Sequence, residues 1–259
     1  MSRTGTVNYH VHKANRQAFE IDAGGITGNL VSPELVATDV PLADLRSGYA
    51  SASFDTDGFA FTDLPTRVAS FENGSGWQEI YDRELVDFLS RDLGAREVVV
   101  FDHTVRVDDP DAGRRPARNV HSDYSREGAE KRIVDILGAE EAARWAGGHC
   151  AFINVWRPVG HPINSAPLGF VRPATVAEED WILIDLIYPD RQGHIMGLAA
   201  NPRHEWVYLS RMTPQEVVCF NIYDSAGRPP VAHSAIDLVE DPDVTTTRKS
   251  IESRTLVRF

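Results

Sequence analysis

The chain contains few cysteines and no long apolar run. Cys150 and Cys219 are the only two cysteines among 259 residues, and neither lies in a pairing or metal-binding motif. We expect both thiols to be buried in a reducing compartment. No apolar run approaches the ~20 residues that a membrane-spanning helix needs, and the start MSRTGTVNYHVHK lacks the apolar segment of a signal peptide. The expected location is therefore the cytoplasm, with no membrane partner.

Basic charge is also scarce. Lys and Arg number 26 against 38 Asp and Glu, which gives a formal charge of −12, and no basic block offers a surface for phosphate groups. Nucleic acid is therefore excluded as an expected partner. The hydrophobic fraction of 42% and the charged fraction of 25% are ordinary globular values, compatible with a monomer or a homodimer. We expect one domain over residues 1–259, with an N-terminal elaboration at 1–75 and helices plus a core at 76–259.

Two helices and a strand can be predicted before the middle of the chain. The segment GWQEIYDRELVDFLSRDLG, residues 76–94, has apolar residues at helical spacing and ends at a glycine. The β-branched run at 97–107 predicts a strand buried on both faces or nearly so. A second helix is expected over about 127–145, ending at Gly147 and Gly148. The first fifty residues suggest loops with one or two edge strands.

The second half of the chain is rich in short strand-like runs. They are AFINVWRP, DWILIDLIY, EWVYLSRM, EVVCFNIYD, VAHSAID and SIESRTLVRF. Many short strands after a helical stretch predict a mainly β fold with flanking helices, built as an antiparallel barrel or a double-sheet jelly roll.

The segment NVHSDYS contains a candidate metal site. His121 and Asp123 are two residues apart, so on an extended strand their side chains leave the same face. His233, late in the chain, is the best candidate for a third ligand. Two imidazoles and one carboxylate are the ligand set of non-heme Fe(II) oxygenases, because three coordination positions stay open. HxD pairs also occur by chance, so this motif alone is weak.

A second motif follows His233 at a fixed interval. Arg248 comes 15 residues later and Ser250 comes 17 later, on the expected last strand. A guanidinium binds a carboxylate with two hydrogen bonds, and a hydroxyl can add another. This pair would hold the far carboxylate of 2-oxoglutarate while its keto acid chelates the metal.

His-x-Asp, a late His and Arg-x-Ser, in that order, resemble the 2-oxoglutarate-dependent oxygenases. The segments FDTDGF, GAREVVVFDHTVR, NVHSDYS, NVWRP, MTPQEVVCFNIYDS and RKSIESR are similar to a family that includes the cephamycin methoxylation component and a fungal meroterpenoid endoperoxidase. The resemblance implies a double-stranded β-helix (cupin-like) core, Fe(II), 2-oxoglutarate and O₂ as co-substrate. It also implies oxidation of a small molecule of secondary metabolism by hydroxylation, desaturation or peroxide formation. Ala232 departs from the pattern, which has Pro there.

Further polar residues share faces of the expected strands. Arg254 has the same parity as Glu252, Ser250 and Arg248, so it could line the cofactor cavity or form a buried ion pair with Glu252. Asn154 and Trp156 share a face and could lie beside the co-substrate, although core packing is an equal alternative for Trp156.

Four other residues are weaker candidates for the site or have expected structural roles. We expect a buried ion pair between Arg106 and Asp224. Tyr124 could reach a substrate, but it has the opposite parity to Asp123. His10 lies near a terminus, which makes it a poor candidate for a catalytic ligand.

Two other functions use the same residues. A jelly-roll protein could bind a small molecule without catalysis, but it would not need a carboxylate clamp near a metal-binding histidine. A zinc hydrolase could use the same three ligands, but neither HSDYS nor AHSA supplies a spare Glu as general base.

Overall fold

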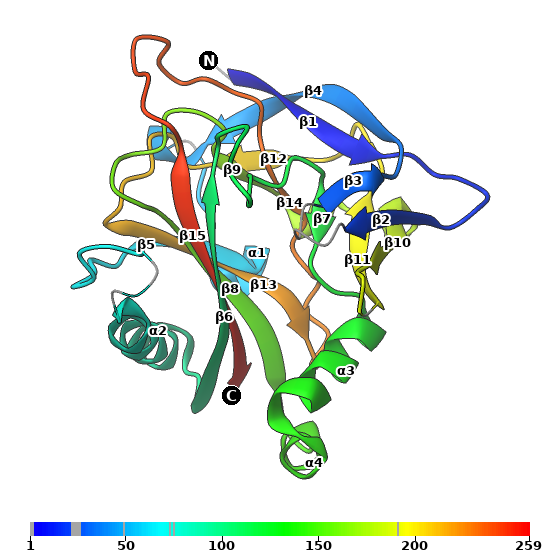
Figure 1. Ribbon diagram of the computed structural model, residues 1–259, viewed down its shortest axis with the longest axis vertical. Coiled ribbons are helices and arrows are strands. Elements are labelled where there is room, and N and C mark those ends of the chain that lie inside the picture. The colour runs from blue at the N-terminus through cyan, green and yellow to red at the C-terminus, as the bar shows by residue number, and fades with distance from the viewer. Residues whose placement is uncertain (1–2, 22–26, 49, 73, 75, 191) are drawn as a thin grey trace.

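The computed structural model describes residues 3–21, 27–48, 50–72, 74, 76–190 and 192–259. Most of the described chain forms two β-sheets (Figure 1), and side chains from both pack into one apolar cluster that includes Phe152, Phe170 and Phe220. The predicted mainly β fold with flanking helices and a jelly-roll-type core is confirmed. No helix in the described ranges is long and apolar enough to cross a membrane.

The larger sheet has ten strands and carries the candidate metal ligands. In spatial order they are β1 (Arg3–His10), β4 (Leu35–Asp44), β12 (Trp206–Tyr208), β9 (Leu168–Val171), β14 (His233–Ala235), β7 (His121–Ser122), β11 (Gln192–Leu198), β10 (Trp181–Ile187), β2 (Gln17–Ile21) and β3 (Thr27–Val31). β14 and β7 are antiparallel neighbours, and His233 is in register with His121.

The smaller sheet has five strands. In spatial order they are β5 (Phe59–Asp63), β13 (Glu216–Asp224), β8 (Cys150–Pro158), β15 (Lys249–Arg258) and β6 (Glu97–Val107). β15 lies between β8 and β6 and pairs with both along most of its length. Alternate residues of these strands face either the larger sheet or helix α2 (Trp77–Leu93).

The predicted helix at 76–94 is confirmed as α2. Trp77, Tyr81, Leu85 and Phe88 recur at helical spacing and are buried against the outer face of the five-stranded sheet. Gly94 ends the helix with φ 74°, a left-handed conformation that costs a glycine little. The short elements of the chain are α1 (Phe54–Asp57) and the 3₁₀ turns Leu45–Ser47, Pro173–Thr175 and Glu178–Asp180.

The second predicted helix is divided, which corrects the sequence prediction. α3 (Arg126–Leu137) ends and α4 (Ala139–Ala146) begins at Gly138, whose φ of 77° and ψ of 161° are incompatible with a continuous helix. Both helices lie at one end of the sheets (Figure 1). Strand β6 over 97–107 is confirmed in position but not in burial. It is an edge strand, and its residues are half-buried because one side has no neighbouring strand.

The first fifty residues contain more strand than predicted. They form β1, β2, β3 and β4, and β4 is flanked by β1 and β12 rather than lying at an edge. Their partners lie far away in sequence, so local pattern does not reveal them. Strands from residues 1–75 enter both sheets, since β5 pairs with β13. The proposed division at residue 75 stays a prediction.

Replacing Leu85 by Ala is expected to lower the free energy of unfolding by about 2–5 kcal/mol, because it leaves a cavity between α2 and the sheet. Ile80→Ala, on the exposed side of the same helix, is the matched control and should change it by less than about 0.5 kcal/mol. Urea unfolding curves measure both. Equal effects would contradict the packing of α2 described above.

Candidate functional site

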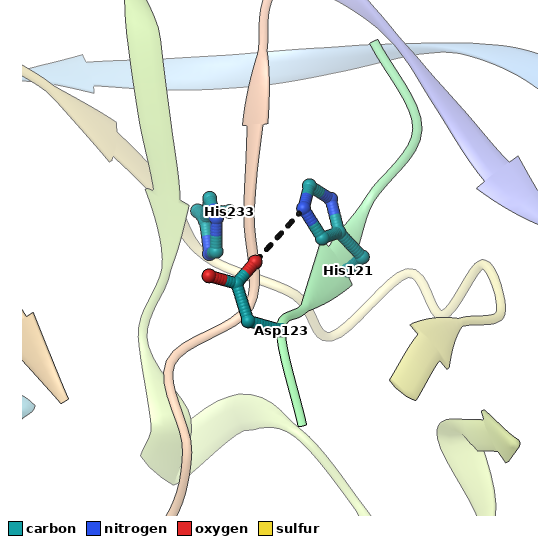
Figure 2. Close-up of side chains that lie close together, drawn as sticks. All are labelled: His121, Asp123 and His233. Atoms are coloured by element: carbon teal, nitrogen blue, oxygen red, sulfur yellow. Dashed lines mark ion pairs between the residues drawn. The ribbon is translucent and has the colours of Figure 1, made fainter. Parts of the chain in front are cut away.

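The three predicted metal ligands lie together where β7 and β14 meet. His121 begins β7, Asp123 follows its end, and His233 begins β14. Figure 2 shows the three side chains converging on one point. One ligand atom from each residue lies within 4.8 Å of the others, and His121 Nε2 is 3.5 Å from Asp123 Oδ1. Such a cluster of two imidazoles and one carboxylate can hold a divalent transition metal.

Backbone carbonyls orient both imidazoles. His121 Nδ1 lies 2.8 Å from the carbonyl of Asn119, and His233 Nδ1 lies 3.2 Å from that of Val231. A carbonyl only accepts, so each Nδ1 carries the proton and each Nε2 lone pair is left for a metal. Burial, followed by the neighbouring His121, lowers the pKa of His233 to about 3. His233 is thus kept neutral, as a metal ligand requires.

The Asp123 carboxylate is fixed from the opposite sheet. Its Oδ2 accepts hydrogen bonds from Asn154 Nδ2 at 2.8 Å and from Arg254 Nε at 3.2 Å. Oδ1 is left on the side of His121. Burial acts to raise the pKa of Asp123, but Arg254 and the two histidines outweigh it and hold that pKa well below its usual range. The carboxylate is therefore ionised and oriented.

Arg254 is the centre of a buried ion-pair network. Its guanidinium donates to Glu252 and Asp102, each at 2.5 Å, and to Thr104 at 3.2 Å, in addition to Asp123. Burial acts to lower the pKa of Arg254, but these carboxylates outweigh it and raise that pKa well above its usual value. The ion pair between Arg254 and Glu252, which the sequence left as an alternative to a place in the cofactor cavity, is thus present. Direct contact of Arg254 or of Asn154 with a cofactor stays a prediction, because both are occupied in orienting Asp123.

Arg248 of the Arg-x-Ser pair lines a narrow cavity next to the two histidines. Arg248 and Ser250 are 2% and 0% exposed. Arg248 Nε and Nη1 and the Ser250 hydroxyl have no hydrogen-bond partner. The Arg248 guanidinium lies 5.4 Å above the ring of Trp156, and the same cavity is bordered by His233. Burial, together with Arg106, lowers the pKa of Arg248 to about 9.

These unpaired donors fit a carboxylate ligand. A buried guanidinium without an acceptor is costly, and a carboxylate would satisfy it with charge-assisted hydrogen bonds. The cavity measures about 20 Å³, which is smaller than 2-oxoglutarate. Side chains that line the cavity therefore have to shift for such a ligand to enter.

A larger cavity opens on the other side of the metal cluster. It measures about 1140 Å³, and His121, Asp123 and Tyr124 are among its lining residues. Tyr124 reaches this cavity because β7 ends at Ser122, so strand parity no longer applies to it. His121 borders both cavities, and the metal cluster thus lies between them.

The predicted ion pair between Arg106 and Asp224 is wrong. Asp224 contacts His149 at 3.0 Å and Arg228 at 3.7 Å, whereas Arg106 borders both cavities. The two residues lie on strands β6 and β13, which are separated by β8 and β15. The sequence shows that the two residues have opposite charges, but it does not show which strands become neighbours.

Sequence reasoning also missed the residues that support the ligands. Asn119 orients His121 through its carbonyl, and its side-chain nitrogen lies 3.3 Å from Nε2 of His10. His10 is buried on an ordered strand, contrary to the expected loose terminus. Asp102 and Thr104 hold Arg254. The alternation of polar residues in FDHTVR indicates a strand with one polar face. The sequence does not reveal which strand pairs with it.

Comparison with known proteins agrees with this geometry. Residues 7–258 match the model of the oxidoreductase/YMDC permease-like domain family. The hydroxylase/desaturase efuI of Hormonema carpetanum is 30% identical over 97% of this chain and 93% of that protein. The Fe(II)/2-oxoglutarate-dependent dioxygenase nvfI of Aspergillus novofumigatus is 27% identical over 83% and 81%.

The same fold is present in a solved structure. The iron and alpha-ketoglutarate-dependent endoperoxidase NvfI superimposes with a TM-score of 0.86 at 24% identity, over 99% of this chain and 98% of that one. The fold and the His-Asp-His cluster define the class of non-heme iron oxygenases. The chain belongs to the family of Fe(II)/2-oxoglutarate-dependent dioxygenases that contains the hydroxylase/desaturases. The predicted family and enzyme class are confirmed.

Replacing Arg254 by Gln is expected to weaken Fe(II) binding by about 10–100-fold, because Asp123 loses its charged partner. Arg258→Gln, on the same strand but paired with Glu97 away from the metal cluster, is the matched control. Anaerobic Fe(II) titration measures both, with circular dichroism to verify folding. Unchanged affinity in a folded Arg254 variant would show that Asp123 needs no such support.

Proposed function

We propose that this enzyme oxidises a C–H bond of a small molecule, by hydroxylation or desaturation, with Fe(II) and 2-oxoglutarate. The observation that carries the proposal is the position of the unpaired Arg248 donors, in a cavity that also borders His121 and His233. A metal site and a carboxylate clamp at one cavity are what a chelating keto diacid requires. Two histidines and one carboxylate favour Fe(II) among divalent metals.

Each part of the site has a separate role in the proposal. His121, Asp123 and His233 hold Fe(II), and Arg248 and Ser250 bind the distal carboxylate of 2-oxoglutarate. When bound, Fe(II) supplies activation of O₂ coupled to oxidative decarboxylation of 2-oxoglutarate.

The protein's own contribution is orientation and exclusion of water. Trp156 forms a buried wall of the narrow cavity, and 2% of its surface is exposed. The larger cavity positions the substrate next to Asp123. Holding the reacting C–H bond close to the metal is the main way in which the fold accelerates the reaction.

The relatives guide the finer part of the proposal. Their names state hydroxylase/desaturase activity or dependence on 2-oxoglutarate. We extend to this chain a role in the biosynthesis of a secondary metabolite. Two buried, unpaired cysteines support a reducing cytoplasmic location.

The alternative of a zinc hydrolase finds less support. Glu252 borders the narrow cavity and is the nearest spare glutamate, but it is held by Arg254 at 2.5 Å. A carboxylate engaged in a buried ion pair is a poor general base. The alternative of a binding protein without catalysis leaves unexplained why a cluster of three metal-ligand residues lies beside the unpaired Arg248.

Addition of 2-oxoglutarate to the anaerobic Fe(II) enzyme should produce the visible charge-transfer band of a chelated keto acid. Arg248→Ala should weaken 2-oxoglutarate binding at least about tenfold, because a charged hydrogen bond contributes about 1.5–3 kcal/mol. Asp123→Ala should abolish the band through loss of iron. Absorption titration measures all three proteins.

Arg83→Ala, on the exposed face of α2, is the control and should titrate as the unchanged protein does. Absence of the band from the folded, iron-loaded enzyme would reject 2-oxoglutarate as co-substrate. Activity with Zn(II) in place of Fe(II) would instead support the hydrolase alternative.

A further inference from the structure

The larger cavity has a charge that contrasts with the rest of the chain. Seven cationic side chains and five carboxylates line it, although the whole chain has a formal charge of −12. Two of the cations, Arg118 and Arg254, form ion pairs with aspartates of the wall. The other five have no ion pair within the described ranges, and they are Arg106, Arg114, Arg115, Lys131 and Arg132. Such a cavity concentrates anions.

Arg132 is the unpaired cation best placed to bind a ligand. It projects from α3, is half-buried, and its guanidinium carbon lies 5.4 Å from the centre of the Phe101 ring. Tyr124, the residue next to Asp123, lines the same cavity. A guanidinium and a phenol thus line one cavity that also borders the metal cluster. The aromatic ring holds the guanidinium in place without neutralising its charge.

Arg106 is a second cation deeper in the same wall. It lies opposite Ser250 on the neighbouring strand and borders both cavities. Its guanidinium donates to the carbonyl of Arg115 at 2.9 Å, and it forms no ion pair within the described ranges. Burial lowers the pKa of Arg106. A half-buried cation of this kind gains from an anion in the cavity.

The same cavity has an apolar part. Phe19, Phe101, Leu186 and Ile195 are among its lining residues. Apolar walls combined with a few placed cations are suited to a ligand that has an apolar body and one charged end.

We propose that the substrate of this oxygenase is an amphipathic organic acid, whose oxyanion is bound by Arg132 with Tyr124 and attracted by Arg106. The apolar body would lie against the apolar wall, with a C–H bond next to the metal cluster. This inference rests on the proposed function in taking the larger cavity as the substrate site. It specifies the chemistry of the substrate, which neither the metal ligands nor the Arg248 clamp determines.

A matched pair of fluorescent probes tests the inference. Anilinonaphthalene sulfonate and phenylnaphthylamine differ only in the sulfonate, so their comparison isolates the oxyanion. The anaerobic enzyme loaded with Fe(II) and 2-oxoglutarate is titrated with each probe. We expect the sulfonate to bind saturably, and Arg132→Gln to weaken its binding at least about tenfold, which corresponds to the loss of one charge-assisted hydrogen bond.

Binding of the neutral probe to Arg132→Gln should stay within about twofold of the unchanged enzyme, since the apolar wall is intact. Arg126→Gln is the matched control. It lies on the same helix, pairs with Glu130 and does not line the cavity, so it should leave both affinities unchanged. Arg132→Lys keeps the charge but loses the planar guanidinium. Its affinity for the sulfonate should therefore lie between those of the unchanged enzyme and Arg132→Gln. Tyr124→Phe tests whether the phenol hydroxyl contributes to sulfonate binding. It takes the place of Arg132→Gln as the test if that variant fails to fold.

Three results would overturn the inference. They are no saturable binding of the sulfonate, equal binding of the sulfonate by Arg132→Gln and the unchanged enzyme, or an equal loss of both probes. The charge-transfer band separates this inference from the proposed function. Loss of the band in folded Arg132→Gln would assign Arg132 to 2-oxoglutarate rather than to the substrate. Absence of the band from the unchanged enzyme, together with sulfonate binding that depends on Arg132, would reject the co-substrate but retain the anion site.

Discussion

The site depends on one buried ion pair between the two sheets. Asp123 directly follows β7 of the ten-stranded sheet, and Arg254 belongs to the five-stranded sheet, with Arg254 Nε 3.2 Å from Asp123 Oδ2. Removing the Arg254 charge would leave Asp123, Glu252 and Asp102 without the cation that they share, which is costly away from water. Because Asp123 is also a candidate metal ligand, the relative position of the sheets and the geometry of the metal cluster are fixed by the same contact.

The register of β15 arranges everything that surrounds this ion pair. Ser250, Glu252 and Arg254 alternate along its inner face and lie opposite Arg106, Thr104 and Asp102 of β6. The residues between them face α2. Ser253 is one of these, and its hydroxyl lies 2.7 Å from Nδ1 of His103. A shift of one residue would exchange the two faces, so the polar site and the apolar packing under α2 require the same register.

The metal cluster separates two cavities of different character. The narrow one contains the unpaired Arg248 and is enclosed by Trp156, whereas the larger one is wide and partly apolar. His121 borders both. This arrangement lets a small co-substrate and a larger substrate approach a metal from different sides, which is consistent with the proposed oxygenase reaction. It also separates the residues that specify the co-substrate from those that would select the substrate.

Local patterns in the sequence were sufficient to predict the α2 helix, the position of β6, the three candidate metal ligands and the Arg-x-Ser motif. These features depend on local spacing: helical periodicity, two-residue alternation and fixed intervals after His233. The folded chain was needed to show that Arg254 holds Asp123, that Arg106 lies far from Asp224, and that Tyr124 and Arg132 face one cavity. These relations depend on which strands become neighbours and where a strand ends, and pairing between distant segments leaves no periodic signal in the chain.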